Sequence, residues 1–249
     1  MILRLKQLIS IWLIKLVQQF GPHKVTVLGR TYEISKDVFN PRFYFTSQFM
    51  AKNMSISQGD IVLDMGTGSG IQAITAGHKA LKVVAIDINP EAVKFARINV
   101  KANNLENKIT VLEGDLFAPL KKQPLFNTVL FTPPYMDGSP ETDFEHALYD
   151  QNKQLLQRFF KEAGDYMKSD GYIQMLYSSI SGQDLALEIA EQQGWKHTVM
   201  AHKKTVTESF YIYKLTLVSF PQATPVGNPS GKIPGKSGAD LREESLRPE

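Results

Sequence analysis

A glycine-rich turn is the segment whose residues most plainly suggest ligand binding. Residues 62–70 have the sequence Val-Leu-Asp-Met-Gly-Thr-Gly-Ser-Gly, and the apolar run Ile61–Asp64 predicts a buried strand that leads into the turn. Its glycines let the backbone turn tightly and let a ligand approach without a Cβ in the way; they are Gly66, Gly68 and Gly70. Dinucleotide-binding turns have a third glycine where this chain has Ile71, so an oxidoreductase is disfavoured. Asp64 suits a ligand that carries an ammonium or sulfonium group.

Three aspartates follow three consecutive predicted strands. Asp64 belongs to the first, and Asp87, 21 residues after Gly66, ends the second. At that separation a carboxylate accepts hydrogen bonds from ribose hydroxyls. Asp115 follows the third strand, where its side chain can meet an adenine amino group. Each acid alone is explained as a solvated strand end. Together, at one edge of a parallel sheet, the three predict a nucleoside site.

A proline turn, Thr132-Pro133-Pro134-Tyr135, follows the fourth predicted strand. Two consecutive prolines fix the backbone and remove two N–H donors, which leaves carbonyl groups free to point into a site. Such acceptors suit a planar NH2 group, whose delocalised lone pair makes it a poor nucleophile until hydrogen bonds orient it. The alternative is a purely structural turn that closes a strand.

Strand and helix patterns alternate from residue 61 to residue 218. Predicted strands are Ile61–Asp64, Lys82–Ile88, Ile109–Leu112, Thr128–Phe131 and Tyr172–Tyr177, and predicted helices are Pro90–Ala102, Lys153–Met167 and Asp184–Gln193. The last two β-rich runs, His197–Val206 and Ser209–Val218, are separated by two residues and predict a hairpin with one strand antiparallel to the sheet. The pattern indicates a doubly wound α/β fold.

Composition and charge divide the chain into three parts. Residues 1–30 carry five bases and no acid, and Met1–Phe20 has helical apolar spacing, so we expect an N-terminal amphipathic helix that packs on the domain. Contact of that helix with a membrane or RNA is the less favoured alternative. Residues 221–249 are rich in Pro, Gly and Ser and predict a disordered tail. Residues 31–220 form the predicted main domain.

The charge of the main domain argues against an autonomous nucleic-acid binder. Once the five bases of residues 1–30 and the four bases and four acids of residues 221–249 are set aside, 19 bases and 21 acids remain. The chain has no cysteine, which excludes disulfides and a cysteine nucleophile and fits a cytoplasmic protein. No histidine pair has the spacing of metal ligands, so we expect no metal.

These motifs resemble those of the class I methyltransferases. From about residue 39 to 217 the chain is similar to the release-factor glutamine methyltransferases and related small methyltransferase-domain proteins. The resemblance implies a Rossmann-like, seven-stranded, mostly parallel sheet that ends in an antiparallel hairpin, with S-adenosylmethionine as cofactor. It implies cofactor contacts by Asp64, Gly66, Gly68, Gly70, Asp87 and Asp115, and by Thr46 in a stretch that closes over the methionine end.

The resemblance also implies the chemistry of the proline turn. Related proteins have Asn where this chain has Thr132; the Asn oxygen and the first proline carbonyl accept hydrogen bonds from the substrate nitrogen, and the aromatic residue stacks on it. A threonine hydroxyl accepts a hydrogen bond but offers no NH2. We therefore expect an N-methyltransferase acting on a protein glutamine, as on a release factor. The alternatives are an RNA base amino group, a small molecule, or a non-catalytic protein that keeps the cofactor pocket.

Overall fold

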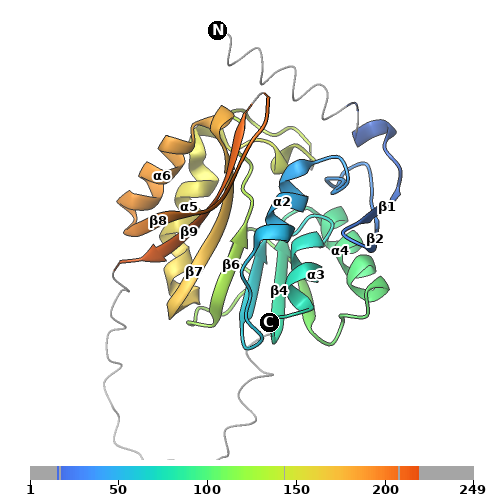
Figure 1. Ribbon diagram of the computed structural model, residues 1–249, viewed down its shortest axis with the longest axis horizontal. Helices are drawn as coiled ribbons and strands as arrows, with labels where there is room; N and C mark the ends of the chain where they lie inside the picture. Colours follow the sequence, from blue (N-terminus) through green and yellow to red (C-terminus); the bar gives the residue numbers. More distant parts are fainter. Residues whose placement is uncertain (1–15, 17, 143, 207, 219–249) are drawn as a thin grey trace, which may run out of the picture.

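A seven-stranded sheet forms the centre of the protein in a computed structural model that describes residues 16, 18–142, 144–206 and 208–218. In chain order its strands are β3 (Ile61–Met65), β4 (Lys82–Asp87), β5 (Ile109–Glu113), β6 (Phe126–Phe131), β7 (Met167–Ser178), β8 (Trp195–Lys204) and β9 (Ser209–Leu217). The strand order is β5-β4-β3-β6-β7-β9-β8 (Figure 1). The first five strands in this order are parallel, and β9 is antiparallel to both of its neighbours. The predicted fold is confirmed.

Helices cover both faces of this sheet (Figure 1). On one face α3 (Ile71–Gly77) and α4 (Pro90–Ala102) share a core with a small hairpin, β1 (Lys24–Val27) and β2 (Arg30–Glu33). On the other face α5 (Gln154–Ala163) and α6 (Gln183–Gln192) form a second core. The remaining helices are α2 (Phe45–Asn53) and the short 3-10 helices η1 (Glu145–Ala147), η2 (Gln151–Lys153), η3 (Gly164–Tyr166) and η4 (Ser179–Ser181).

The central strands are apolar because they are buried on both sides. In β3, Val62 packs into the core of α3 and α4, while its neighbour Leu63 packs into the core of α5 and α6. Both side chains are fully buried. A strand between two helical layers needs a continuous apolar run, which explains why the sequence pattern located it.

The strand order reverses at β3, which lies between β4 and β6. From β3 the chain moves outward through β4 to β5 and then crosses back to β6. The carboxyl ends of these parallel strands meet at one edge of the sheet, and the helices on either side diverge there. Such a switch point opens a crevice outside the strand ends, where ligands of doubly wound folds bind.

One predicted helix was too long at both ends. The helix expected over Lys153–Met167 is α5, Gln154–Ala163, because Lys153 has a left-handed φ of 56° that a helix does not accept. After the 3-10 turn η3, Met167 already pairs with Phe126 of β6, so β7 begins there. As a result β7 is longer than the predicted strand Tyr172–Tyr177.

The expected boundary at residue 30 falls inside the packed domain. The β1–β2 hairpin crosses it, and the side chains of Val25 and Val27 are buried in the core. Asn99 of α4 clamps the hairpin, because its side chain accepts a hydrogen bond from the Glu33 N–H at 2.7 Å and donates one to the Glu33 carbonyl at 2.9 Å. The domain therefore includes residues that we assigned to the N-terminal extension.

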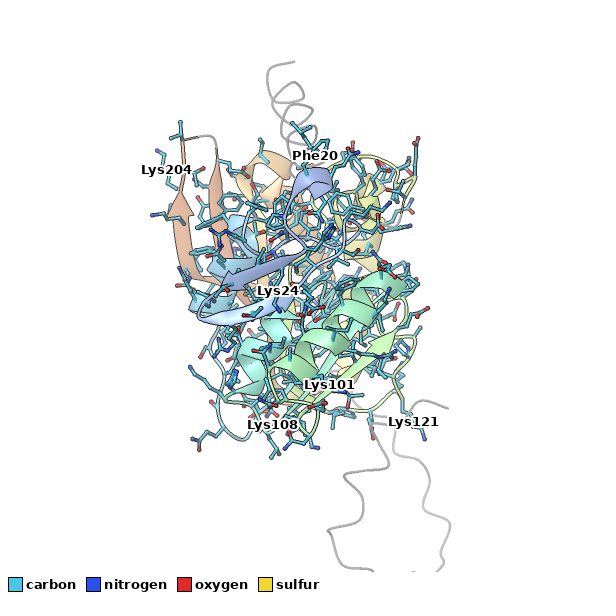
Figure 2. The ribbon with its side chains drawn as sticks, turned by 90° about the vertical axis from the view of Figure 1, so that its right-hand side faces the viewer. Phe20, Lys24, Lys101, Lys108, Lys121 and Lys204 are labelled. Atoms are coloured by element: carbon cyan, nitrogen blue, oxygen red, sulfur yellow. The ribbon has the colours of Figure 1, made fainter. Side chains whose placement is uncertain are left out.

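The N-terminal segment meets the domain through a polar residue. Gln18 is buried and donates hydrogen bonds to the carbonyls of Ser35 and Val38, whereas Leu16 and Phe20 are exposed. Phe20 lies at the same end of the domain as Lys204, far from Lys108 (Figure 2). Most of the predicted N-terminal helix and the whole predicted tail, residues 221–249, lie outside the described residues. Among the helices described, none is long and apolar enough to cross a membrane.

Candidate active site

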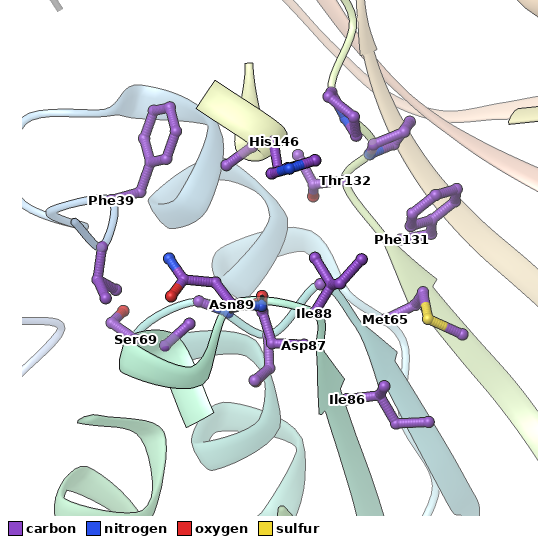
Figure 3. Close-up of a pocket in the computed structure, with 18 of the residues that line it drawn as sticks. Phe39, Met65, Ser69, Ile86, Asp87, Ile88, Asn89, Phe131, Thr132 and His146 are labelled. Carbon is purple, nitrogen blue, oxygen red and sulfur yellow. Dashed lines mark hydrogen bonds between the residues drawn. The ribbon is translucent and has the colours of Figure 1, made fainter. Parts of the chain in front are cut away.

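A cavity opens at the carboxyl edge of the sheet, at the switch point (Figure 3). Most of its lining comes from six segments: the glycine turn after β3, the end of β4, the end of β5, the proline turn after β6, residues 37–47, and residues 146–148. Elements far apart in the sequence therefore form a single site, as the predicted convergence of strand ends requires.

The glycine turn adopts a backbone that other residues disfavour. Gly66, Gly68 and Gly70 have φ angles of 71°, 54° and 83°, which lie in the left-handed region. Gly66 and Gly68 line the cavity, and a Cβ placed on either would meet no protein atom within 4 Å. Gly70 does not line the cavity, because it packs against Ala96 of α4 at the start of α3. The first two glycines thus leave open space for a ligand, and the third permits helix packing.

Asp64 stabilises the glycine turn through hydrogen bonds and does not line the cavity. Its side chain is fully buried, and Oδ2 accepts hydrogen bonds from Thr67 Oγ1 at 2.6 Å and from the Ala73 N–H at 2.9 Å. Its other oxygen, Oδ1, is buried and has no hydrogen-bond partner among the described residues. Burial raises the pKa of Asp64 to about 7, although the two hydrogen bonds oppose the shift.

Asp87 joins the glycine turn to the next helix. Its Oδ2 accepts the Gly68 N–H at 2.8 Å, and its Oδ1 accepts the Asn89 N–H at 3.0 Å. Burial raises its pKa above the usual range, and the backbone hydrogen bonds partly offset this. Asn89 in turn caps α4 and donates to the Asp37 carbonyl at 2.8 Å. Each oxygen of Asp87, which lines the cavity, keeps capacity for a ligand hydrogen bond.

Asp115 lines the cavity but is not a free strand-end acid. The third strand, β5, ends at Glu113, one residue beyond the predicted Leu112, and Asp115 comes two residues later. Asp115 Oδ2 accepts a hydrogen bond from the Arg158 guanidinium of α5 at 2.6 Å in a partly exposed ion pair. One carboxylate oxygen remains available to a ligand.

All four residues of the proline turn line the cavity. The carbonyls of Pro133 and Pro134 accept no hydrogen bond from the described residues. The Tyr135 carbonyl accepts a hydrogen bond from Lys153 Nζ at 2.8 Å. Burial raises the pKa of the Tyr135 hydroxyl. The turn therefore presents two unpaired carbonyls and an aromatic ring beside the cavity.

The stretch before α2 closes one side of the cavity. Phe39, Tyr44 and Thr46 line it, and the Phe39 ring packs against those of Tyr44 and Phe144 with centroids 4.5 and 4.9 Å apart. Phe45, the neighbour of Thr46, lies outside the cavity and packs on Phe210. Thr46 lies in the first turn of α2 and lines the cavity, and its contact with the methionine end of the cofactor stays a prediction.

Sequence reasoning missed four residues of this region: Gln72, Asn89, His146 and Lys153. Asn89 is the N-cap of α4, and His146 lies near Thr132 in Figure 3. Gln72 carried a usable signal, because a polar residue shortly after the glycines stands among the apolar residues Ile71, Ala73 and Ile74. Lys153 carried none. No group of three or more metal-ligating side chains is present among the described residues.

Comparison with known proteins gives consistent matches. The methyltransferase small domain family model matches residues 36–213. A Methanocaldococcus jannaschii protein named "Putative protein N5-glutamine methyltransferase" is 31% identical over 76% of this chain and 96% of its own length. The "Release factor glutamine methyltransferase" of Fusobacterium nucleatum is 29% identical over 72% of this chain, which spans 57% of that protein.

A solved structure supports the same fold. The crystal structure of the Methanocaldococcus jannaschii "tRNA m1G37 methyltransferase" superimposes with a TM-score of 0.56 at 22% identity, and the match covers 79% of this chain and 56% of that one. This likeness shows the Rossmann-like fold. The residues that the family model matches, 36–213, include the residues that line the cavity. More narrowly, the chain belongs to the methyltransferase small domain family, and it is an S-adenosylmethionine-dependent methyltransferase.

Proposed function

We propose that the cavity binds S-adenosylmethionine and that the protein methylates a planar nitrogen, the side-chain amide of a protein glutamine. The observation that carries the proposal is the proline turn: Pro133 lines the same cavity as the glycine turn, and its carbonyl accepts no hydrogen bond from the described residues. A bound nucleoside at the glycines and an NH2 group at the prolines would share one enclosed site.

The residues of the cavity fit this cofactor. Gly66 and Gly68 face open space in the cavity, and a Cβ on either residue would occupy room that a ligand needs. Asp87 would accept the ribose hydroxyls, and the remaining oxygen of Asp115 would accept the adenine amino group. Thr46 would contact the methionine end, and the unpartnered Oδ1 of Asp64 would favour positive charge nearby. When bound, the cofactor supplies an electrophilic methyl group on a sulfonium.

The proline turn would orient the nitrogen for attack. The Pro133 carbonyl accepts one N–H of the substrate, the hydroxyl side of Thr132 accepts the other, and Tyr135 stacks on the amide plane. Hydrogen bonds to both hydrogens turn the nitrogen lone pair toward the methyl carbon. Methyl transfer would give the nitrogen a new bond to carbon in place of the carbon–sulfur bond of the cofactor, and the nitrogen would lose one proton to solvent, so charge balances.

The protein substrate is favoured over RNA by two observations. A relative matched over 96% of its own length, at 31% identity, is named as a protein N5-glutamine methyltransferase. Another, matched over 92% of its own length at 28% identity, is named as a probable tRNA (guanine(10)-N2)-dimethyltransferase, but it matches a smaller share of this chain, 65% against 76%. The main domain also carries slightly more acids than bases, which does not favour a polyanion. An RNA base amino group presents the same planar NH2, and the matched tRNA methyltransferase has the same fold, so RNA is the second candidate.

Replacing Thr132 tests the chemistry. Thr132→Val keeps the shape of the side chain and removes the hydroxyl acceptor, so the methyl-transfer barrier should rise by about 2–4 kcal/mol. Cofactor affinity should stay within a factor of two, and Thr132→Asn should preserve or raise activity. The assay is transfer of labelled methyl groups to fractionated protein, tRNA and metabolites. If the Val variant is as active as the parent on its substrate, residue 132 has only a structural role in the turn.

A further inference from the structure

Gln72 is a polar residue in a place that favours apolar ones. It lies in the first turn of α3, where the side chains of Ile71, Ala73 and Ile74 are all buried. Gln72 itself is only 5% exposed. Burying an amide is unfavourable unless hydrogen bonds replace those to water. Its presence here therefore calls for partners.

The protein satisfies only part of this amide. Gln72 Nε2 donates to Thr132 Oγ1 at 3.4 Å, the long end of the hydrogen-bond range. Its carbonyl oxygen accepts no hydrogen bond from the described residues, and the residue lines the cavity beside the proline turn. An unused acceptor thus belongs to a residue that contacts Thr132, and Thr132 directly precedes Pro133 in the proline turn.

The same contact changes what Thr132 can do. A hydroxyl oxygen has two acceptor positions, and the bond from Gln72 uses one of them. A planar NH2 group has two hydrogens and needs an acceptor for each. The Pro133 carbonyl supplies one, and Thr132 alone would supply the other with its single remaining lone pair.

We propose that Gln72 is a specificity-determining residue whose carbonyl oxygen shares, with Thr132 Oγ1, the second N–H of the substrate. This inference rests on the proposed function. Three oxygen acceptors around one nitrogen select a group with two hydrogens to donate. They reject a carboxylate, which has no hydrogen to donate and whose charge would face unpaired oxygens. Glutamine and glutamate side chains would be distinguished in this way.

The decisive variant is Gln72→Met, which keeps length and volume and removes both hydrogen-bonding groups. Methyl transfer to a glutamine-bearing peptide should fall roughly 10²-fold in kcat/KM, as for the loss of one preorganised polar contact. Affinity for S-adenosylmethionine should stay within twofold. Thr75→Val is the matched control, because Thr75 is on the same helix, bonds the Ile71 carbonyl and does not line the cavity.

A second background separates specificity from packing. In the Thr132→Asn protein the new side-chain amide at residue 132 supplies a carbonyl acceptor. Adding Gln72→Met in this background should therefore lower kcat/KM for the glutamine peptide by less than about tenfold. A merely structural role for Gln72 would give equal losses in both backgrounds. Equal losses, or no loss in the parent background, would overturn the proposal.

Peptide binding keeps this inference distinct from the proposed function. With S-adenosylhomocysteine present, calorimetry should show that the parent binds a glutamine peptide at least tenfold more tightly than its glutamate counterpart. Gln72→Met should abolish that preference. If the parent binds glutamine selectively but transfers no methyl group to it, only the proposed function fails. If the parent binds both peptides equally, or neither, the inference about Gln72 is wrong.

Discussion

Replacing Asp64 by Asn should make the protein more stable at neutral and alkaline pH. The carboxyl group is fully buried, accepts two hydrogen bonds through Oδ2 and leaves Oδ1 without a partner among the described residues. Asn keeps the shape and an acceptor oxygen for the Ala73 N–H, and it removes the charge. The buried charge is what the substitution is expected to relieve.

The magnitude follows from the raised pKa. Burial shifts the pKa of Asp64 from 3.8 to about 7, and each pKa unit corresponds to about 1.4 kcal/mol, so ionisation destabilises the fold by at most about 4 kcal/mol. Between about pH 4 and pH 7 the folded protein binds more protons at this residue than the unfolded chain. Stability from Asp64 therefore falls as pH rises through this window and stays low above it.

Urea denaturation, monitored by circular dichroism, measures the free energy of unfolding at each pH. The stability difference between Asp64→Asn and the parent should be smallest near pH 4 and largest near pH 8. Asp170→Asn is the control, because it is the same substitution at an exposed residue and removes no buried charge. If the curves for Asp64→Asn and the parent run parallel across this range, the carboxylate is not buried as a charge and the reasoning is refuted.

Three further predictions, made with four variants, test the cavity. Asp87→Ala should weaken S-adenosylmethionine binding by about 1–3 kcal/mol in calorimetry, and unchanged affinity would disprove the ribose placement. Gly68→Ala and Gly70→Ala should each cost roughly 1–2 kcal/mol of stability, since both have positive φ, but only Gly68→Ala should also weaken cofactor binding. Lys153→Met should lower kcat about tenfold at constant cofactor affinity, because the Tyr135 carbonyl loses its donor; an unchanged kcat would exclude a positioning role.

Local patterns in the sequence determined the framework of the site. The apolar run of β3 and the glycines after it predict a buried strand and a left-handed turn from adjacent residues alone. Asn89 and Pro90 likewise predict the start of α4, and the observed cap is the Asn89 side chain accepting from the Glu91 N–H. These features depend on neighbours within a few residues, so the sequence shows them directly.

Tertiary structure decided which groups face the ligand. Asp64 resembles a ligand-facing acid in the sequence, but β3 turns its carboxylate toward Thr67 and Ala73 beneath the turn. Gln72 meets Thr132 across 60 residues of chain, and Arg158 reaches Asp115 across 43. Such pairs depend on the strand order and on the direction of each side chain at the sheet edge. Both are set by the packing of the whole domain, which the periodicity of any single segment does not encode.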